Sequence, residues 1–252
     1  MENLEAQEVL LRWGDHGTPK SAIFDDKYFC EDQGYEEAVY VCCEGNSLQK
    51  RFSGLDPQKK GTFTVLETGF GTGLDFCCAW QVWDEYAPVS WKLHFISVEL
   101  YPLSSEQVGR ALGLWPALSG YKDSLVSQYQ FSIHDIKNFY FNDQRVCLTI
   151  AFDHVVLALS KIKEKRLAPQ GADALFLDGF APSKNPEMWS PEVFKAMAAL
   201  SHEGTTLSTF TVAGNVRRGL EAAGFTVQRV PGHGKKQHIL TGFFNPQGLA
   251  VQ

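Results

Sequence analysis

The chain has 252 residues, 44% of them hydrophobic and 21% charged, which is the balance of an ordinary globular protein. No apolar run reaches the roughly 18 residues that a membrane-spanning helix needs, and the acidic start lacks the basic region of a signal peptide. We therefore expect a cytoplasmic protein with no membrane partner. The net charge of −6 weighs mildly against a nucleic-acid substrate, although a local basic patch stays compatible with it.

The six cysteines show no spacing that is typical of a metal site, and none lies in a C-x-x-C pair. We predict reduced, mostly buried thiols and no bound metal. The sequence also contains no G-x-S-x-G elbow and no Walker phosphate loop.

The first sixty residues predict little regular structure. We expect one short strand at Val9–Trp13 and a helix at Gly34–Cys43, whose first turn carries acids that suit the helix dipole. A polar connection follows, and the first long β-rich run begins after it. We predict an N-terminal extension over residues 1–60 that packs on a core formed by residues 61–252.

From residue 61 onward, apolar β-rich runs alternate with helical ones. Strands are predicted at Thr62–Thr68, Lys92–Glu99, Val146–Phe152, Asp173–Asp178, Thr205–Phe210, Phe225–Val230 and Ile239–Phe243, with helices starting near Leu74, Ser104, Val155, Pro191 and Val216. This alternation predicts an α/β fold with a doubly wound, mostly parallel sheet. The last two strands have a short link and should pair as an antiparallel hairpin at the sheet edge. Residues 119–142 are aromatic-rich and receive no assignment.

A glycine-rich turn joins the first core strand to the first core helix. Glu67 precedes Gly69, Gly71 and Gly73 in the pattern E-x-G-x-G-x-G. A glycine backbone can adopt positive φ and approach a ligand closely, and the helix that follows presents unpaired N–H groups to the same space. The pattern resembles motif I of class I S-adenosylmethionine-dependent methyltransferases, although a surface turn can also be rich in glycine.

Three acids end or directly follow predicted strands at the edge where ligands bind in doubly wound sheets. Glu99 could accept the ribose hydroxyls of an adenosine or cap the next helix. Asp153 could accept the adenine amino group or be a helix N-cap. Asp178 leads into a loop with Phe180 and prolines, and its carboxylate could hold an amine so that the lone pair faces a methyl donor.

Two further groups have both a functional and an ordinary interpretation. Positive charge gathers at Arg217, at Arg229 and at residues 232–236, which include Lys235 and Lys236, and it could contact phosphates or be ordinary solvated surface. The segment with Asp25, Asp26 and Tyr28 could line a pocket or form a surface turn.

Together these segments resemble the methyltransferase domain of the MnmC family, which takes part in the biosynthesis of 5-methylaminomethyl-2-thiouridine in tRNA. The resemblance covers Phe24–Phe29, Gly34–Phe52, Glu67–Leu74, His94–Glu99, Phe176–Trp189 and Thr209–Lys236. The run Leu-Asp-Gly-Phe-Ala-Pro-x-Lys-Asn-Pro at residues 177–186 is its most specific part.

This resemblance implies a class I, Rossmann-like methyltransferase. It implies methyl transfer from S-adenosyl-L-methionine to the aminomethyl nitrogen on C5 of the wobble uridine, and hence a tRNA anticodon region as partner. It places Glu67, the three glycines and Glu99 at the cofactor and Asp178 at the amine, and it favours Asp25, Asp26 and Tyr28 as site residues. Bifunctional members carry a flavin-dependent oxidase domain, which we expect to be separate or missing here.

Three other functions remain open at this stage. The chain could methylate a small-molecule amine, which its acidic charge would suit. It could bind the cofactor without catalysis. It could also be a nicotinamide- or flavin-dependent oxidoreductase, although its glycine spacing differs from G-x-G-x-x-G.

Overall fold

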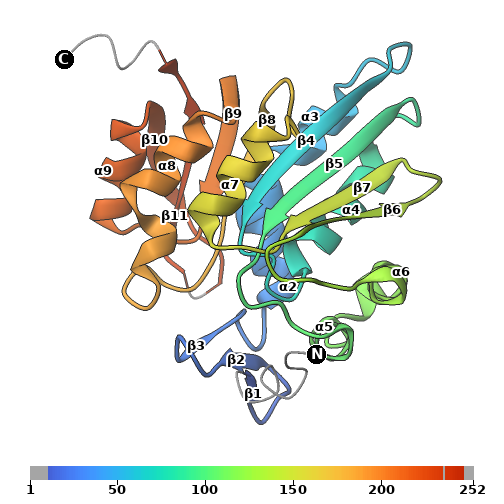
Figure 1. The fold of residues 1–252 in the computed structure, drawn as a ribbon, viewed down its shortest axis with the longest axis vertical. Coiled ribbons are helices and arrows are strands. Elements are labelled where there is room, and N and C mark those ends of the chain that lie inside the picture. Colours follow the sequence, from blue (N-terminus) through green and yellow to red (C-terminus); the bar gives the residue numbers. More distant parts are fainter. Residues whose placement is uncertain (1–10, 235, 247–252) are drawn as a thin grey trace.

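An eight-stranded sheet forms the centre of the computed structural model, which describes residues 11–234 and 236–246 (Figure 1). Its strand order is β10-β11-β9-β8-β4-β5-β7-β6. The strands are β4 (Gly61–Thr68), β5 (Trp91–Val98), β6 (Ile136–Phe141), β7 (Val146–Ala151), β8 (Ala172–Leu177), β9 (Ser201–Thr209), β10 (Phe225–Pro231) and β11 (His238–Phe244). The five central strands β9, β8, β4, β5 and β7 are parallel.

Helices cover both faces of this sheet. One face carries α3 (Leu48–Ser53), α4 (Leu74–Tyr86), α5 (Ser105–Leu112) and α6 (Ser119–Gln128), and the other carries α7 (Val155–Glu164), α8 (Pro191–Ala198) and α9 (Gly214–Ala222). Successive side chains of β4 serve the two layers in turn, since Val65 belongs to the first hydrophobic core and Leu66 to the second. The strand is buried on both sides, which explains its continuous apolar sequence.

The predicted fold class is confirmed, including its antiparallel edge. β10 lies at the edge and pairs with β11, and β11 also pairs in antiparallel fashion with β9. The seven predicted strands and the five predicted helix starts all correspond to observed elements, with ends that shift by a few residues.

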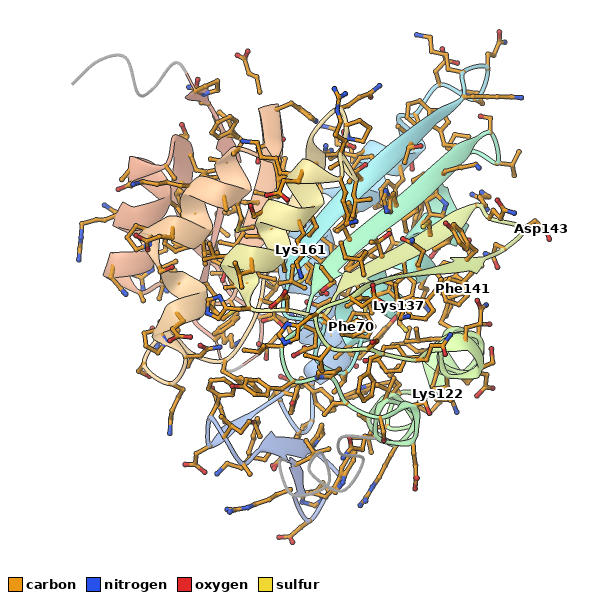
Figure 2. The ribbon with its side chains drawn as sticks, in the orientation of Figure 1. Phe70, Lys122, Lys137, Phe141, Asp143 and Lys161 are labelled. Atoms are coloured by element: carbon orange, nitrogen blue, oxygen red, sulfur yellow. The ribbon has the colours of Figure 1, made fainter. Side chains whose placement is uncertain are left out.

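Residues 119–142, which the sequence left unassigned, contain α6 and β6. β6 pairs in antiparallel fashion with β7, and the turn between them holds Asn142, Asp143 and Gln144 at positive φ. Figure 2 labels Asp143 at the tip of this hairpin. The sheet therefore ends in an antiparallel strand at this edge too.

The segment before β4 supplies a small sheet and a continuous helix that changes from α to π geometry. The small sheet pairs β1 (Leu11–Trp13), β2 (Pro19–Ser21) and β3 (Asp26–Lys27), whereas residues 9 and 10 of the predicted first strand lie outside the described residues. The predicted helix continues from α2 (Gly34–Ala38) into a six-residue π-helix, η1 (Val39–Glu44). The division into an extension and a core stays a prediction. Within the described residues, no helix is long and apolar enough to cross a membrane.

Candidate active site

A cavity of about 670 Å³ opens at the carboxyl ends of the central strands. Loops that follow parallel strands meet at one edge of a sheet, so this edge is where a doubly wound fold can build a binding site. Of the residues predicted from the sequence, the cavity is lined by Asp26, Tyr28, Glu67, Gly69, Gly71, Glu99, Asp153, Asp178, Phe180 and Lys236. Asp25, Gly73 and Arg217 do not line it, and Lys235 lies outside the described residues.

The glycine turn after β4 forms one wall of the cavity. Gly69, Gly71 and Gly73 have φ values of +90°, +54° and +76°, which side-chain-bearing residues rarely adopt. A Cβ atom at Gly71 would lie 3.2 Å from Cδ1 of Tyr28, so this wall admits no side chain without displacement of its neighbour. Gly73 is the N-cap of α4 and packs beneath the turn rather than in the cavity.

Two acids lie beside this turn. Glu67 is 1% exposed, and the Ser97 hydroxyl donates to its Oε2 at 2.6 Å. Burial, followed by the neighbouring Asp75, raises the pKa of Glu67 well above its usual value. Burial also raises the pKa of Asp75 to about 6, although the Cys42 thiol donates to its Oδ2 at 2.9 Å. The sequence did not single out Asp75, because an acid in the first turn of a helix is ordinary.

Asp178 follows β8 directly and faces the same space. Its backbone carbonyl accepts from the Thr68 hydroxyl at 2.9 Å, which ties the end of β8 to β4. Burial and then Asp75 raise the pKa of the Asp178 carboxyl well above its usual value, while the Gly179 N–H and Lys236 oppose that rise. The cavity therefore holds Glu67, Asp75 and Asp178 close together, in surroundings that raise the pKa of each carboxyl group.

Lys236 lies at the wall of this acidic region. It forms an ion pair with Glu37 of α2, and its Nζ lies 4.3 Å from the centre of the Phe210 ring. The turn that carries Lys236 also contacts η1, because the Tyr40 hydroxyl donates to the Pro231 carbonyl at 3.0 Å. Glu37 was missed for the same reason as Asp75, since it too occupies the first turn of a helix.

Glu99 follows β5 and faces the glycine turn. Its Oε2 accepts from the Gly71 N–H at 2.8 Å and its Oε1 from the Tyr101 N–H at 2.7 Å. Burial raises the pKa of Glu99, and these backbone hydrogen bonds reduce the rise. Each carboxylate oxygen can accept more than one hydrogen bond, so Glu99 keeps acceptor capacity toward the cavity.

Asp153 follows β7 and already has strong partners. Lys161 of α7 donates to its Oδ2 at 2.6 Å, and the His154 N–H donates to its Oδ1 at 2.8 Å (Lys161 is labelled in Figure 2). Burial alone would raise the pKa of Asp153, but Lys161, the His154 N–H and His134 outweigh it and hold the pKa below its usual value. Asp153 is thus an ionised, internally paired acid, in contrast to Asp178.

Aromatic side chains cover the remaining wall. Phe180 stacks on Phe24 with ring centres 4.8 Å apart and meets the edge of Tyr28 at 5.0 Å. Asp26 fixes this contact, because its Oδ2 accepts from the Ala181 N–H at 3.0 Å. Asp25 instead pairs with Lys20 and Lys184 and is 64% exposed.

The basic residues behave differently from one another. Arg217 is 55% exposed on α9 and pairs with Glu221 of the same helix at 3.4 Å, whereas Lys236 reaches the cavity.

Within the described residues, no group of three or more histidine, cysteine or acidic side chains is placed to hold a metal ion.

These residues fit S-adenosyl-L-methionine. The cofactor carries an ammonium and a sulfonium, and the cavity offers the carboxyl groups of Glu67, Asp75 and Asp178, whose raised pKa values show that a bound cation would be favourable there. The glycine turn provides a wall where a Cβ atom would intrude, and Glu99 has acceptors for hydroxyl groups at the next strand end.

Comparison with known proteins identifies the family. Residues 116–245, just over half of the chain, match the family described as S-adenosyl-L-methionine-dependent methyltransferase. The tRNA 5-methylaminomethyl-2-thiouridine biosynthesis bifunctional protein MnmC of Methylobacillus flagellatus is 46% identical over 94% of this chain and 35% of the relative. Its namesake from Pseudomonas syringae pv. tomato is 47% identical over 95% of this chain and 35% of the relative. The chain thus spans about a third of the length of the curated relatives it matches.

A solved structure shares the fold. MnmC2 from Aquifex aeolicus superposes with a TM-score of 0.70 over 96% of this chain and 75% of that chain, at 17% sequence identity. The resemblance drawn from the sequence motifs is confirmed by these matches. The chain therefore belongs to the S-adenosyl-L-methionine-dependent methyltransferases and is an enzyme that uses this cofactor.

Proposed function

We propose that the enzyme methylates the aminomethyl nitrogen of 5-aminomethyl-(2-thio)uridine at the wobble position of tRNA. The observation that carries this proposal is Asp178, a carboxyl group at a strand end inside a cavity that also holds Asp75 and Glu67. Such a cavity suits a substrate that brings an amine. The MnmC relatives are named for the biosynthesis of a modified uridine in tRNA, and this supports tRNA as the substrate class.

The cofactor would be held by the glycine turn and two strand-end acids. Gly69 and Gly71 would lie against it, with Glu67 near its ammonium and Glu99 at its ribose hydroxyls. Asp153 would accept from the adenine amino group with the acceptor capacity left by Lys161. When bound, S-adenosyl-L-methionine supplies an electrophilic methyl group on a sulfonium centre.

Asp178 would act on the substrate amine. As a carboxylate it accepts an amine N–H, which fixes the nitrogen and directs its lone pair toward the methyl-donor side of the cavity. Methylation places a positive charge on that nitrogen, and the carboxylate stabilises it and can receive one of its protons. Positioning and charge stabilisation would supply most of the rate enhancement, because direct displacement needs reacting atoms close and aligned.

The aromatic wall and the basic residues would hold the rest of the substrate. Phe180 and Tyr28 offer ring faces for a base, with Asp26 keeping their loops together. Lys236, together with Asp25, Arg217 and Lys235, stays a predicted contact to the tRNA anticodon region.

We further propose that the chain works in the cytoplasm together with a flavin-dependent oxidase activity. The relatives are named as bifunctional, and this chain corresponds to about a third of each. On this view an oxidase unit exposes the amine that Asp178 then positions, and residues 61–252 form the methyltransferase core with 1–60 as its extension.

A small-molecule amine is the second candidate substrate. The acidic lining of the cavity and the net charge of −6 favour it, because neither requires a polyanionic partner.

The test is methyl transfer from labelled S-adenosyl-L-methionine to tRNA that carries 5-aminomethyluridine, beside tRNA that lacks the aminomethyl group. We expect incorporation only into the first. Equal labelling of both tRNAs, or labelling of free amines alone with the cofactor still bound, would reject the proposed substrate.

A further inference from the structure

A second hollow of about 350 Å³ adjoins the active-site cavity at the same sheet edge. The two spaces share Ala181, Phe210 and Lys236 as lining residues. The hollow is built by the loop after β8, the loop after β9, the end of β10 and the start of β11. It thus continues the row of strand ends from Asp178 outward.

The lining of this hollow, which we call the basic groove, has the opposite charge to the cavity. Its described lining residues include Arg229, Lys236 and His238 and no acid. Pro182 and Val212 add apolar surface, and Val212 is 39% exposed. A groove with cations on one side and apolar surface on the other suits a nucleotide, whose phosphate and base need these two surroundings.

Arg229 and His238 are placed by the hairpin. Arg229 is paired with Leu240 and Pro231 with His238, so Arg229 and His238 are diagonal neighbours on one face. The Arg229 Nη2 and the His238 Nδ1 are 2.9 Å apart. Because a guanidinium can only donate, the Nδ1 accepts and the neutral ring carries its proton on Nε2, where it remains a donor. Nδ1 takes up one Arg229 N–H, and the pair keeps the other guanidinium N–H groups and the Nε2–H of His238 for an anion.

The groove lies at the right distance from the reacting group. Asp178 follows β8, and three strand spacings separate β8 from β10, which carries Arg229, so these two backbones are on the order of 14 Å apart. A nucleotide linked to the target uridine spans a distance of this order from its base to its phosphate. Lys236, which lines both spaces, would stand at the passage between them.

We infer that the basic groove binds the phosphodiester-linked neighbour of the target nucleotide, with Arg229 at the phosphate. The inference rests on the proposed RNA substrate and adds a subsite that the acidic cavity cannot provide. It also gives Arg229, rather than the exposed Arg217, the main role near the reaction centre.

The test compares three substrates: a trinucleotide with central 5-aminomethyluridine, the same trinucleotide with neutral methylphosphonate links, and the free nucleoside. Arg229→Gln should lower kcat/KM on the charged trinucleotide by about tenfold, since it removes a charge-assisted hydrogen bond to the phosphate. It should leave kcat/KM on the nucleoside and the affinity for S-adenosyl-L-methionine unchanged. The wild type should show a lower kcat/KM on the methylphosphonate trinucleotide than on the charged one. On the methylphosphonate trinucleotide, Arg229→Gln should lower kcat/KM little further, because both changes remove the same contact.

Arg166→Gln is the matched control. Arg166 is an exposed arginine after α7, near the opposite end of the sheet, and lines neither space. Two results would overturn the inference while the proposed function stands. One is that the losses in kcat/KM caused by Arg229→Gln and by the methylphosphonate links add up in full. The other is that Arg229→Gln lowers kcat/KM on the nucleoside as much as on the charged trinucleotide. A wild type that methylates none of the RNA substrates would overturn both.

Discussion

The acidic cavity and the basic groove lie side by side at one sheet edge and differ mainly in charge. The cavity gathers carboxyl groups from β4, β5, β8 and α4, whereas the groove presents Arg229, His238 and Lys236. A cavity that holds several acids close together suits cations such as a sulfonium and an amine, and the groove suits a phosphate. The overall charge of −6 describes neither region, which shows that net charge is a poor guide to the local charge of a binding surface.

The largest effect should follow from changing the acid at the reacting nitrogen. Asp178→Asn keeps the shape but removes the charge that holds and stabilises the amine, so single-turnover methyl transfer should fall by about 10²–10³-fold, the cost of losing one stabilising group in the transition state. Cofactor affinity, measured by calorimetry, should stay within about threefold.

Asp173→Asn provides a control at the other end of the same strand. Asp173 accepts from the Thr64 N–H at 2.8 Å and does not line the cavity. Methyl transfer by this variant should resemble the wild type. If the two variants lose activity equally, Asp178 has no special role at the amine.

The second prediction concerns stability and pH. The pKa of Asp75 is raised from 3.8 to about 6 in the folded chain, so the folded state binds this proton more tightly than the unfolded state. Its contribution to stability is full below about pH 4 and is lost as pH rises through about 6. Asp75→Asn should therefore stabilise the protein at pH 7 by up to about 3 kcal/mol, less any weakening of the Cys42 hydrogen bond, since one pKa unit corresponds to about 1.4 kcal/mol.

Urea denaturation of the cofactor-free protein at pH 4 and pH 7 measures this difference. The gain in unfolding free energy should appear at pH 7 and vanish near pH 4. If Asp75→Asn raises the unfolding free energy equally at both pH values, folding does not raise the pKa of Asp75.

The third prediction separates the two strand-end acids at the cofactor. Glu99→Gln should lower the affinity for S-adenosyl-L-methionine by about 10- to 100-fold, because hydrogen bonds to a charged group contribute roughly 1.5–3 kcal/mol. Asp153→Asn should lower this affinity less, because the Asp153 carboxylate already accepts hydrogen bonds from Lys161 and the His154 N–H. An analogue without a ribose hydroxyl should lose less affinity in the Glu99 variant than in the wild type. Equal losses for this analogue would place the ribose elsewhere.

The smallest effect should come from the residue that the two regions share. Lys236 lowers the pKa of both Asp178 and Asp75, so Lys236→Gln should raise both pKa values and move the acid limb of the pH–rate profile to higher pH. Asp178 faces Asp75 on α4, Glu37 on α2 and its own neighbour Gly179, and removal of Lys236 also frees Glu37 to repel it. An acid limb that does not move would show that Lys236 serves the groove alone.

Much of the fold could be predicted because its central strands are buried on both faces. Such strands are continuous apolar runs, and the run before Gly69 is easy to recognise. β6 was missed although its sequence does alternate, with Phe139 and Phe141 buried and Tyr140 exposed. α6 was missed because Leu125 is its one fully buried residue, so no apolar stripe marks it.

The site was predictable where function follows from a strand end. Asp178 and Glu99 line the cavity as expected, because the acids after parallel strands converge whatever the helices do. Asp75 and Glu37 could not be predicted, since they reach the cavity only through the packing of α2 and η1 against α4.

The contact between the β10–β11 turn and α2 has a consequence for how the enzyme matures. Tyr40 and Pro231 are 191 residues apart in the sequence and are joined by a hydrogen bond. The ion pair between Lys236 and Glu37 closes a loop of similar length. Contacts this distant in sequence are costly in chain entropy and form late in folding. During synthesis, the central strands can assemble while the wall of the cavity is still missing. Capacity to bind S-adenosyl-L-methionine should thus appear as one of the last events, after the final hairpin has docked.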